Sequence, residues 1–408
     1  MKLTPQTAQP WLDPERFWPT LDAATAALDT PFGAVSVQAL AHNAFDMLRR
    51  ANGTTIRVAS KSVRVRGVMD AVLALPGYAG VLSYTLAEAL WLAETIEDVV
   101  VGYPSVDRTA IALLGSSPEL ARRVTIMVDS LDQLDAVDAV LPPGQRENIR
   151  VCLELDAAWR SRVLGRLGVY RSPVRSVAQA KKLGAAIVAR EGFTLVGMMA
   201  YEAQVAGVVN RPPGKPLLGH TVDYVQKHSV EELHERRGAV VAALRQLADL
   251  EFVNGGGTGS LETTSADESV TEIAAGSGLF GPHLFDSYSH FSPAPAAAFA
   301  LSVVRKPTPT MATILGGGWV ASGPPAPDRL PQLAWPLGLK YVGREAAGEV
   351  QSPVTGEAAA SLRVGDRVWL RHTKAGELSE HINEFAMVDD GEIVDTFPTY
   401  RGEGKAFL

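Results

Sequence analysis

The sequence predicts an α/β protein in which a (β/α)8 barrel of the TIM-like kind is followed by a smaller C-terminal β domain. Three observations support this fold class. Eight short runs with strand character lie between Thr55 and Phe280, helical patterns separate most of them, and the pattern changes after about residue 292. Strands that alternate with helices over roughly 230 residues are typical of a closed parallel barrel.

The eight runs are continuous apolar stretches, as expected of parallel strands that are buried on both faces. They cover residues 55–60, 80–84, 98–104, 123–129, 149–156, 195–202, 251–257 and 271–280. The competing architecture is a doubly wound open sheet, which usually carries G-x-G-x-x-G after its first strand. No such motif follows residues 55–60, and this favours the barrel.

Helices are predicted before and between the strands. Residues 36–51 form a helical pattern that precedes the first strand. Residues 130–141 open with a serine and acidic residues, which suit the positive end of a helix. Residues 229–250 carry apolar residues at helical spacing, and we expect this helix to begin at a capping box formed by Ser229 and Glu232.

The chain divides by composition into three parts. Residues 1–30 are predicted to be an N-terminal segment that packs on the β domain, and residues 31–291 to be the barrel. Residues 292–408 contain short runs punctuated by proline and glycine, without a long helical pattern. This last part is predicted to be a compact β domain.

Composition excludes several classes of function. With 46% hydrophobic and 20% charged residues, the chain is an ordinary globular protein. Its net charge of -7 gives no general attraction to nucleic acid or to an anionic membrane. The first residues lack the apolar core of a signal peptide, and Cys152 is the only cysteine. We therefore expect a cytoplasmic enzyme that acts on a small molecule, with no nucleic-acid or membrane partner.

The stretch IRVASKSVRV, residues 56–65, places Lys61 directly after the first predicted strand. In a barrel, functional groups gather at the carboxyl ends of the strands. A lysine at a strand end is often only a solvated charge, but here it is also a candidate for an amine that forms a Schiff base. Arg57, Arg64 and Arg66 would help the amine to lose its proton if they point inward.

The stretch NGGGTGSLETT, residues 254–264, follows the seventh predicted strand. Its exposed backbone N–H groups and hydroxyls are suited to a phosphate, which barrels commonly hold in the loops after strands seven and eight. An ordinary glycine-rich turn is the alternative. The candidate phosphate contacts are Gly256, Gly257, Thr258 and Gly259, with Ser277 and Gly278 after the eighth strand. Together with Lys61 they indicate pyridoxal 5'-phosphate.

Two further motifs lie at strand ends. Arg166 stands between glycines in VLGRLGVY, residues 163–170, after the fifth strand, and could hydrogen-bond the phenolate oxygen of the cofactor. Tyr201 ends the sixth strand and could pack against the cofactor or hydrogen-bond to it. The alternatives are an exposed loop arginine and a core tyrosine.

The order of these motifs resembles that of the fold-type III pyridoxal-phosphate enzymes. Within them the chain looks most like the D-threonine aldolase/D-serine dehydratase group, in particular the bacterial amino acid deaminase/aldolase family. The likeness extends from the strand-one lysine to the tail motif GDRVWLRHTKAGELSEHINEF. It implies a Schiff base at Lys61, phosphate contacts near Gly257, Thr258 and Gly259, a cofactor contact at Arg166, and a homodimer.

The chain departs from this group at two places. Members that use zinc or manganese carry His-x-Asp or His-x-Cys late in the β domain, whereas this chain has His372-Thr373-Lys374. His372 could bind a divalent metal (Mn, Mg or Zn) together with Glu377, Glu380 or His381. Alternatively, Lys374 could supply the positive charge, or His372 could act as a base without a metal. Gln204 is a further candidate cofactor contact, standing where the aldolases have a histidine.

These observations predict a lyase that cleaves β-hydroxy D-amino acids to glycine and an aldehyde, with Lys61 and His372 as catalytic residues. Dehydration of D-serine or D-threonine with loss of ammonia is the first alternative, and amino acid racemisation is the second. A non-catalytic protein that binds pyridoxal phosphate is the alternative from another class, against which the extra β domain argues.

Overall fold

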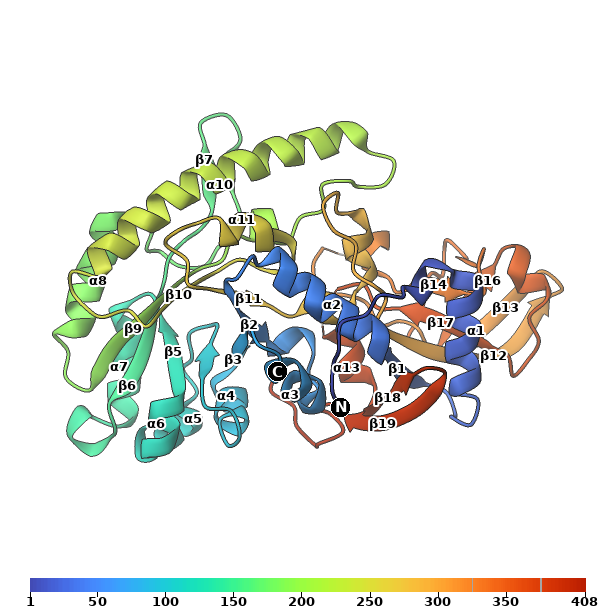
Figure 1. Ribbon diagram of the computed structural model, residues 1–408, viewed down its shortest axis with the longest axis horizontal. Helices are drawn as coiled ribbons and strands as arrows, with labels where there is room; N and C mark the ends of the chain where they lie inside the picture. The colour runs from blue at the N-terminus through green and yellow to red at the C-terminus, as the bar shows by residue number, and fades with distance from the viewer. Residues whose placement is uncertain (325, 375) are drawn as a thin grey trace. The chain divides into compact units, whose positions relative to one another are not determined.

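The fold was examined in a computed structural model that describes residues 1–324, 326–374 and 376–408. Two compact units share the chain (Figure 1). The barrel unit contains Met47–Lys61, Leu75–Gly276 and Phe407–Leu408. The sheet unit contains Met1–Asp46, Ser62–Ala74 and Ser277–Ala406. The predicted domain boundaries at residues 30 and 291 stay predictions, because the two units interleave along the chain.

Eight parallel strands of the described chain close into a barrel, which confirms the predicted fold class (Figure 1). They are β2 (Thr55–Ala59), β3 (Tyr78–Ser83), β4 (Val99–Val101), β5 (Val124–Val128), β6 (Ile149–Glu154), β9 (Phe193–Ala200), β10 (Phe252–Gly255) and β11 (Glu272–Ala275). Each coincides with one of the eight apolar runs. Because all eight are parallel, their carboxyl ends meet at one rim, which we call the rim of the barrel.

Helices follow the strands on the outside of the barrel. They are α4 (Leu86–Leu92), α5 (Arg108–Ser116), α6 (Pro118–Arg123), α7 (Leu131–Val140), α8 (Val177–Val188), α9 (Ala203–Ala206), α10 (Pro216–Leu244) and α11 (Leu261–Ser265). The helix predicted at 130–141 is confirmed, with Ser130 as its cap and Gln133 completing a capping box. In Figure 1, α10 runs past α8, against which it packs.

The predicted start of the longest helix is wrong. Ser229 does not cap a helix but lies buried in the middle of α10, which begins at Pro216. A proline is well accommodated in the first turn of a helix, where its missing N–H is not needed. The Ser-x-x-Glu pattern at 229–232 therefore lies in the middle of a longer helix whose buried face continues toward Gly219.

The interior of the barrel combines an apolar cluster with a layer of ion pairs. Val100, Met127, Cys152, Met199 and Phe252 form part of the apolar cluster. Arg57 is buried beside it and forms ion pairs with Glu272 and Asp98, both at 2.7 Å. A buried guanidinium needs such partners, because an unpaired charge in the interior is strongly unfavourable.

The sheet unit contains nine strands of the described chain. They are β1 (Phe32–Ser36), β12 (Ala297–Thr308), β13 (Met311–Leu315), β14 (Gln332–Trp335), β15 (Lys340–Tyr341), β16 (Gln351–Thr355), β17 (Arg367–Arg371), β18 (Glu384–Asp389) and β19 (Glu392–Pro398). β1 pairs antiparallel with β12 and parallel with β18. An early segment of the chain thus completes a sheet formed mostly by the last hundred residues.

Among the described residues, five α-helices start in the sheet unit, and one of them continues into the barrel unit. They are α1 (Pro14–Ala24), α2 (Val37–Arg50), α3 (Arg66–Leu73), α12 (Ser277–Phe280) and α13 (Glu377–His381). The helix predicted at 36–51 is confirmed by α2. The N-terminal helix α1 contacts the sheet, because the indole N–H of Trp369 donates a 2.8 Å hydrogen bond to Asp22. None of the described helices is long and apolar enough to cross a lipid bilayer.

Candidate active site

Lys61 lies in a short 3-10 helix, Ser60–Ser62, immediately after β2. Its side chain is exposed at the rim. The hydroxyl of Tyr103 lies 3.4 Å from Lys61 Nζ and hydrogen-bonds with it. Tyr103 follows β4, so the two side chains come from the carboxyl ends of different strands. The placement of Lys61 agrees with the prediction from the sequence.

The arginines around Lys61 do not act as predicted. Arg57 is held by Glu272 and Asp98 inside the barrel. Arg64 pairs with Glu380, and Arg66 pairs with Glu403, within the sheet unit. Each of these guanidinium groups is directed to a carboxylate partner, and the cation found near the amine is a different one.

That cation is Arg171, which the sequence reasoning missed. Its guanidinium donates hydrogen bonds to the Tyr103 hydroxyl at 3.3 Å and to Glu154 at 3.2 Å. It also lies over the rings of Tyr103 and Tyr201, 4.9 and 4.8 Å from their centroids. Such cation–π contacts favour a planar guanidinium between two aromatic rings. Arg171 follows the G-R-L-G motif by three residues, and its nearness to that motif was the available signal.

The electrostatics of these groups follow from burial and charge. Burial alone would raise the pKa of Tyr103, but the charges of Lys61 and Arg171 outweigh it and lower that pKa. For Tyr201, burial prevails and raises the pKa to about 12. Burial also raises the pKa of Glu154, although Arg171 opposes the shift. Tyr103 is therefore the phenol that gives up its proton more readily.

Residues 255–259 form the Gly-rich turn, which begins at the last residue of β10. A Cβ placed at Gly257 would lie 3.4 Å from the ring of Tyr201, so the turn passes directly beside this side chain. The backbone N–H of Gly256 donates to Glu202 at 3.0 Å, and that of Gly257 to the Ser260 hydroxyl at 3.2 Å. The amide of Gly256 thus serves to hold the turn itself.

The lysine and the Gly-rich turn share the rim of one barrel. β2 and β10 are separated only by β11, since β11 pairs with both. With neighbouring strands about 4.8 Å apart, β2 and β10 are separated by roughly 10 Å. A continuous path of contacts also runs from Lys61 through Tyr103, Arg171 and Tyr201 to Gly257.

Arg166 lies in a hairpin that follows β6, formed by β7 (Trp159–Ser161) and β8 (Gly165–Leu167). Gly165 and Gly168 on either side have φ of +72° and +129°, conformations that favour glycine. The guanidinium pairs with Asp156 at 2.8 Å and donates to the carbonyl of Val169 at 2.9 Å. Its cofactor contact stays a prediction.

Gln204 is buried and its side-chain amide donates to the carbonyl of Ala157 at 2.8 Å. It therefore joins α9 to the segment that follows β6. Ser277 and Gly278 follow β11 and open α12, at the point where the chain enters the sheet unit. Their predicted phosphate contacts, like those of Thr258 and Gly259, stay predictions.

His372 lies in the sheet unit and is 2% exposed. Its backbone carbonyl accepts a hydrogen bond from His283 N–H at 3.1 Å. Burial lowers the pKa of His372 to about 4, with Arg371 adding to this effect and Glu377 opposing it. The imidazole is therefore neutral near pH 7, and burial opposes its protonation.

In the described ranges, no group of three or more His, Cys, Asp or Glu side chains lies in a position to hold a metal ion. Of the predicted partners of His372, Glu377 accepts from the backbone N–H of Lys374 at 2.7 Å. Glu380 pairs with Arg64, and His381 stacks on Trp319 with ring centroids 4.8 Å apart. All three predicted ligands therefore have partners of their own and do not form a metal site with His372 in the described chain.

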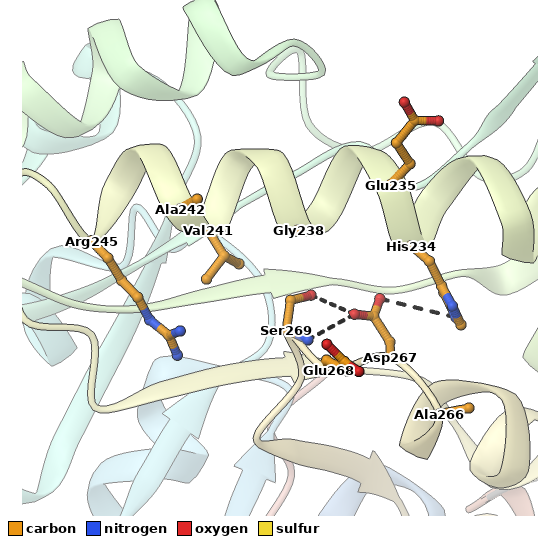
Figure 2. Close-up of a pocket in the computed structure, with 10 residues that line it drawn as sticks. All are labelled: His234, Glu235, Gly238, Val241, Ala242, Arg245, Ala266, Asp267, Glu268 and Ser269. Carbon is orange, nitrogen blue, oxygen red and sulfur yellow. Dashed lines mark hydrogen bonds and ion pairs between the residues drawn. The ribbon is translucent and has the colours of Figure 1, made fainter.

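A separate groove of about 480 Å³ lies on the outside of the barrel, between α10 and residues 266–269 (Figure 2). Its polar lining residues are His234, Glu235, Arg245, Asp267, Glu268 and Ser269. Figure 2 shows that Asp267 and Ser269 bond with each other, while Arg245 lies at the other end. None of the predicted site residues lines this groove.

Comparison with known proteins identifies a family that agrees with the barrel fold. Residues 35–283, more than half of the chain, match the family described as alanine racemase, N-terminal domain. A search of curated proteins finds no match.

Among solved structures, D-threonine aldolase from Filomicrobium marinum is similar with a TM-score of 0.75 at 21% identity, covering 92% of this chain and 96% of that one. D-threo-3-hydroxyaspartate dehydratase from Delftia sp. HT23 gives 0.69 at 18%, covering 92% and 98%. Alanine racemase from Corynebacterium glutamicum gives 0.56 at 17%, covering 84% and 90%. At these identities the likeness concerns the fold.

Proposed function

Because the chain belongs to the family of the alanine racemase N-terminal domain, we propose that it is a pyridoxal-phosphate-dependent lyase acting on β-hydroxy D-amino acids. Membership confirms the resemblance to the fold-type III enzymes that the motifs indicated. The observation that carries the proposal is the path from Lys61 through Tyr103, Arg171 and Tyr201 to the Gly-rich turn. This path connects the amine of Lys61 with a turn of the kind that binds phosphate, at the same rim of the barrel.

The residues present suit the cofactor. Lys61 would hold its aldehyde carbon, the Gly-rich turn with Ser277 and Gly278 its phosphate, and Arg166 its phenolate oxygen. Tyr201 and Gln204 would border its ring. When bound, pyridoxal phosphate supplies an electron sink for the electron pair left at Cα as the Cα–Cβ bond breaks.

The rim also offers a path for the proton of the amine. A lysine must be deprotonated to act as a nucleophile. The Tyr103 hydroxyl, 3.4 Å from Lys61 Nζ, is placed to exchange this proton, and Arg171 keeps the phenol acidic. Glu154 in turn fixes the guanidinium of Arg171.

His372 is proposed as the base that removes the β-hydroxyl proton, a role that rests on the resemblance, since burial opposes protonation of its imidazole. The aldol cleavage that follows would give glycine and an aldehyde. Dehydration is the second candidate, since a similar structure is that of a D-threo-3-hydroxyaspartate dehydratase. A homodimer, a cytoplasmic location and a divalent metal at His372 are retained as proposals.

The test is incubation of the purified protein with pyridoxal phosphate and D-threonine, D-serine or D-3-hydroxyaspartate, with and without EDTA. Glycine with an aldehyde identifies an aldolase, whereas ammonia with an oxo acid identifies a dehydratase. Activity that survives EDTA excludes the metal. Enantiomer interconversion would instead indicate a racemase, and cofactor binding without any product would indicate a non-catalytic binding protein.

A further inference from the structure

Three charged side chains lie buried beneath the Gly-rich turn. Glu202 follows β9, Arg237 lies on α10, and Asp267 follows α11; they are 3%, 0% and 4% exposed. Arg237 bonds to Asp267 at 2.8 Å and to Glu202 at 3.4 Å. We call these three residues the buried triad. The guanidinium thus joins two carboxylates that come from different sides of the turn.

Glu202 holds the turn through both of its carboxylate oxygens. One accepts the Gly256 N–H at 3.0 Å, and the other accepts the Thr264 hydroxyl at 2.6 Å. Thr264 and Ser260 are also in contact, at 3.0 Å between their hydroxyl oxygens, and the Ser260 hydroxyl accepts the Gly257 N–H at 3.2 Å. The carboxylate of Glu202 therefore orients two successive amides of the turn. It binds the N–H of Gly256 directly, and it is linked to that of Gly257 through the hydroxyls of Thr264 and Ser260.

The Gly-rich turn is packed closely against Arg237 of the buried triad and against Thr264. Gly256 has a φ of +69°, and a Cβ there would lie 2.6 Å from the Thr264 hydroxyl oxygen. A Cβ at Gly255 would lie 2.5 Å from a guanidinium nitrogen of Arg237. These contacts favour glycine at both positions, and the two side chains that make them, Thr264 and Arg237, are both bonded to Glu202.

The outer end of the buried triad is anchored at the groove. Asp267 accepts hydrogen bonds from the backbone N–H and the hydroxyl of Ser269, as Figure 2 shows. Burial alone would raise the pKa of Asp267, but Arg237 and the Ser269 hydrogen bonds outweigh it and lower that pKa. Asp267 therefore stays ionised and holds Arg237 toward Glu202.

We infer that Glu202 is a positioning residue for the phosphate end of the cofactor, setting the geometry of the Gly-rich turn through its bonds to Gly256 and Thr264. This inference rests on the proposed function, because it presumes that the turn receives a phosphate ester. Glu202 does not itself face the phosphate, which a carboxylate would repel. Its effect is confined to the phosphorylated form of the ligand.

The test compares pyridoxal 5'-phosphate with pyridoxal, which has the same aldehyde but no phosphate. Glu202→Gln keeps the size of the side chain but loses the charge and one acceptor oxygen. We expect the affinity for the phosphorylated aldehyde to fall about 10-fold to 100-fold, and that for pyridoxal to change less than about threefold. Glu235→Gln, an exposed carboxylate of the groove on α10, is the matched control and should change neither.

A purely structural role for Glu202 would lower both affinities equally, and no role would leave both unchanged; either result overturns the inference. Thermal unfolding of each variant shows whether it is folded. If Glu202→Gln does not fold, Thr264→Val removes one of the same bonds and should show a smaller loss with the same selectivity. Failure of the proposed function is a different result: the wild-type protein would then form no borohydride-reducible bond between Lys61 and either aldehyde.

Discussion

The rim and the groove are two polar regions of the same barrel unit, and they differ in how their charges are arranged. At the rim, the hydroxyl of Tyr103 lies within hydrogen-bond distance of both Lys61 and Arg171. In the groove, Arg245 lies apart from the cluster formed by His234, Asp267 and Ser269 (Figure 2). Convergence of polar groups at strand ends, rather than the size of a hollow, is therefore the reason for proposing the site at the rim.

The comparison also separates two uses of buried charge. The charges of the buried triad hold a backbone turn, and Arg57 with its partners fills the barrel interior. The rim instead presents an exposed amine beside a phenol whose pKa is lowered. Substitutions at the rim should therefore change the chemistry, whereas those of groove residues that do not belong to or anchor the buried triad, such as Glu235 and Gly238, should change stability at most.

The largest effect is expected for Lys61→Ala. Removing the only amine proposed to hold the cofactor should abolish both the absorbance band near roughly 420 nm and the borohydride-reducible bond, and lower turnover on the order of 1000-fold or more. Lys181→Ala, an exposed lysine on α8, is the matched control. A band of unchanged intensity in Lys61→Ala would show that another amine holds the cofactor.

The next effect is expected for Gly256→Ala at the Gly-rich turn. The φ of +69° is strained for alanine, and the new methyl group would lie 2.6 Å from the Thr264 hydroxyl oxygen and 2.9 Å from Ile273. We expect a loss of about 1 to 3 kcal/mol in the free energy of unfolding, together with weaker cofactor binding. Urea unfolding and cofactor titration measure the two; a variant as stable as the wild type would contradict the packing described.

The barrel could be predicted from the sequence because each strand is a continuous apolar run that ends in polar residues. Lys61 and the Gly-rich turn were found in the same way, since each follows a strand directly. The start of α10 could not be predicted, because a capping pattern at Ser229 lies inside the helix and the buried face that extends it depends on tertiary packing.

Arg171 and Glu202 were missed for a different reason. Both stand beside motifs that were recognised, but their partners are distant in sequence: Arg171 meets Tyr103, and Glu202 meets Gly256 and Thr264. Periodicity and local spacing carry no information on such contacts. The sheet shows the same limit, since β1 joins strands that follow it by more than 250 residues.

A smaller effect, which depends on pH, is expected for Glu154→Gln. Burial raises the pKa of this carboxyl above its ordinary value of 4.5. A raised pKa contributes stability that is fully present below pH 4.5 and is lost as the pH rises through the folded-state value. The amide of glutamine does not titrate, so the variant should gain stability relative to the wild type as the pH rises from 4 toward 8. The turnover of the variant should be lower than that of the wild type.

Thermal unfolding of both proteins across that pH range measures this gain. Glu235→Gln controls for the removal of one negative charge at an exposed position. A stability difference that stays constant, or that shrinks as the pH rises, would show that Arg171 rather than burial governs Glu154.

The smallest effect is expected for Gly238→Ala in the groove, and it is a gain in stability. Gly238 lies inside α10 and lines the groove, and a Cβ there would meet no atom within 4 Å. Alanine in a helix interior is favoured over glycine by about 0.5 to 1 kcal/mol, so the free energy of unfolding should rise by that amount. Cofactor affinity and turnover should equal those of the wild type. A loss of either one would mean that the groove takes part in function, and the distinction between rim and groove would then have to be abandoned.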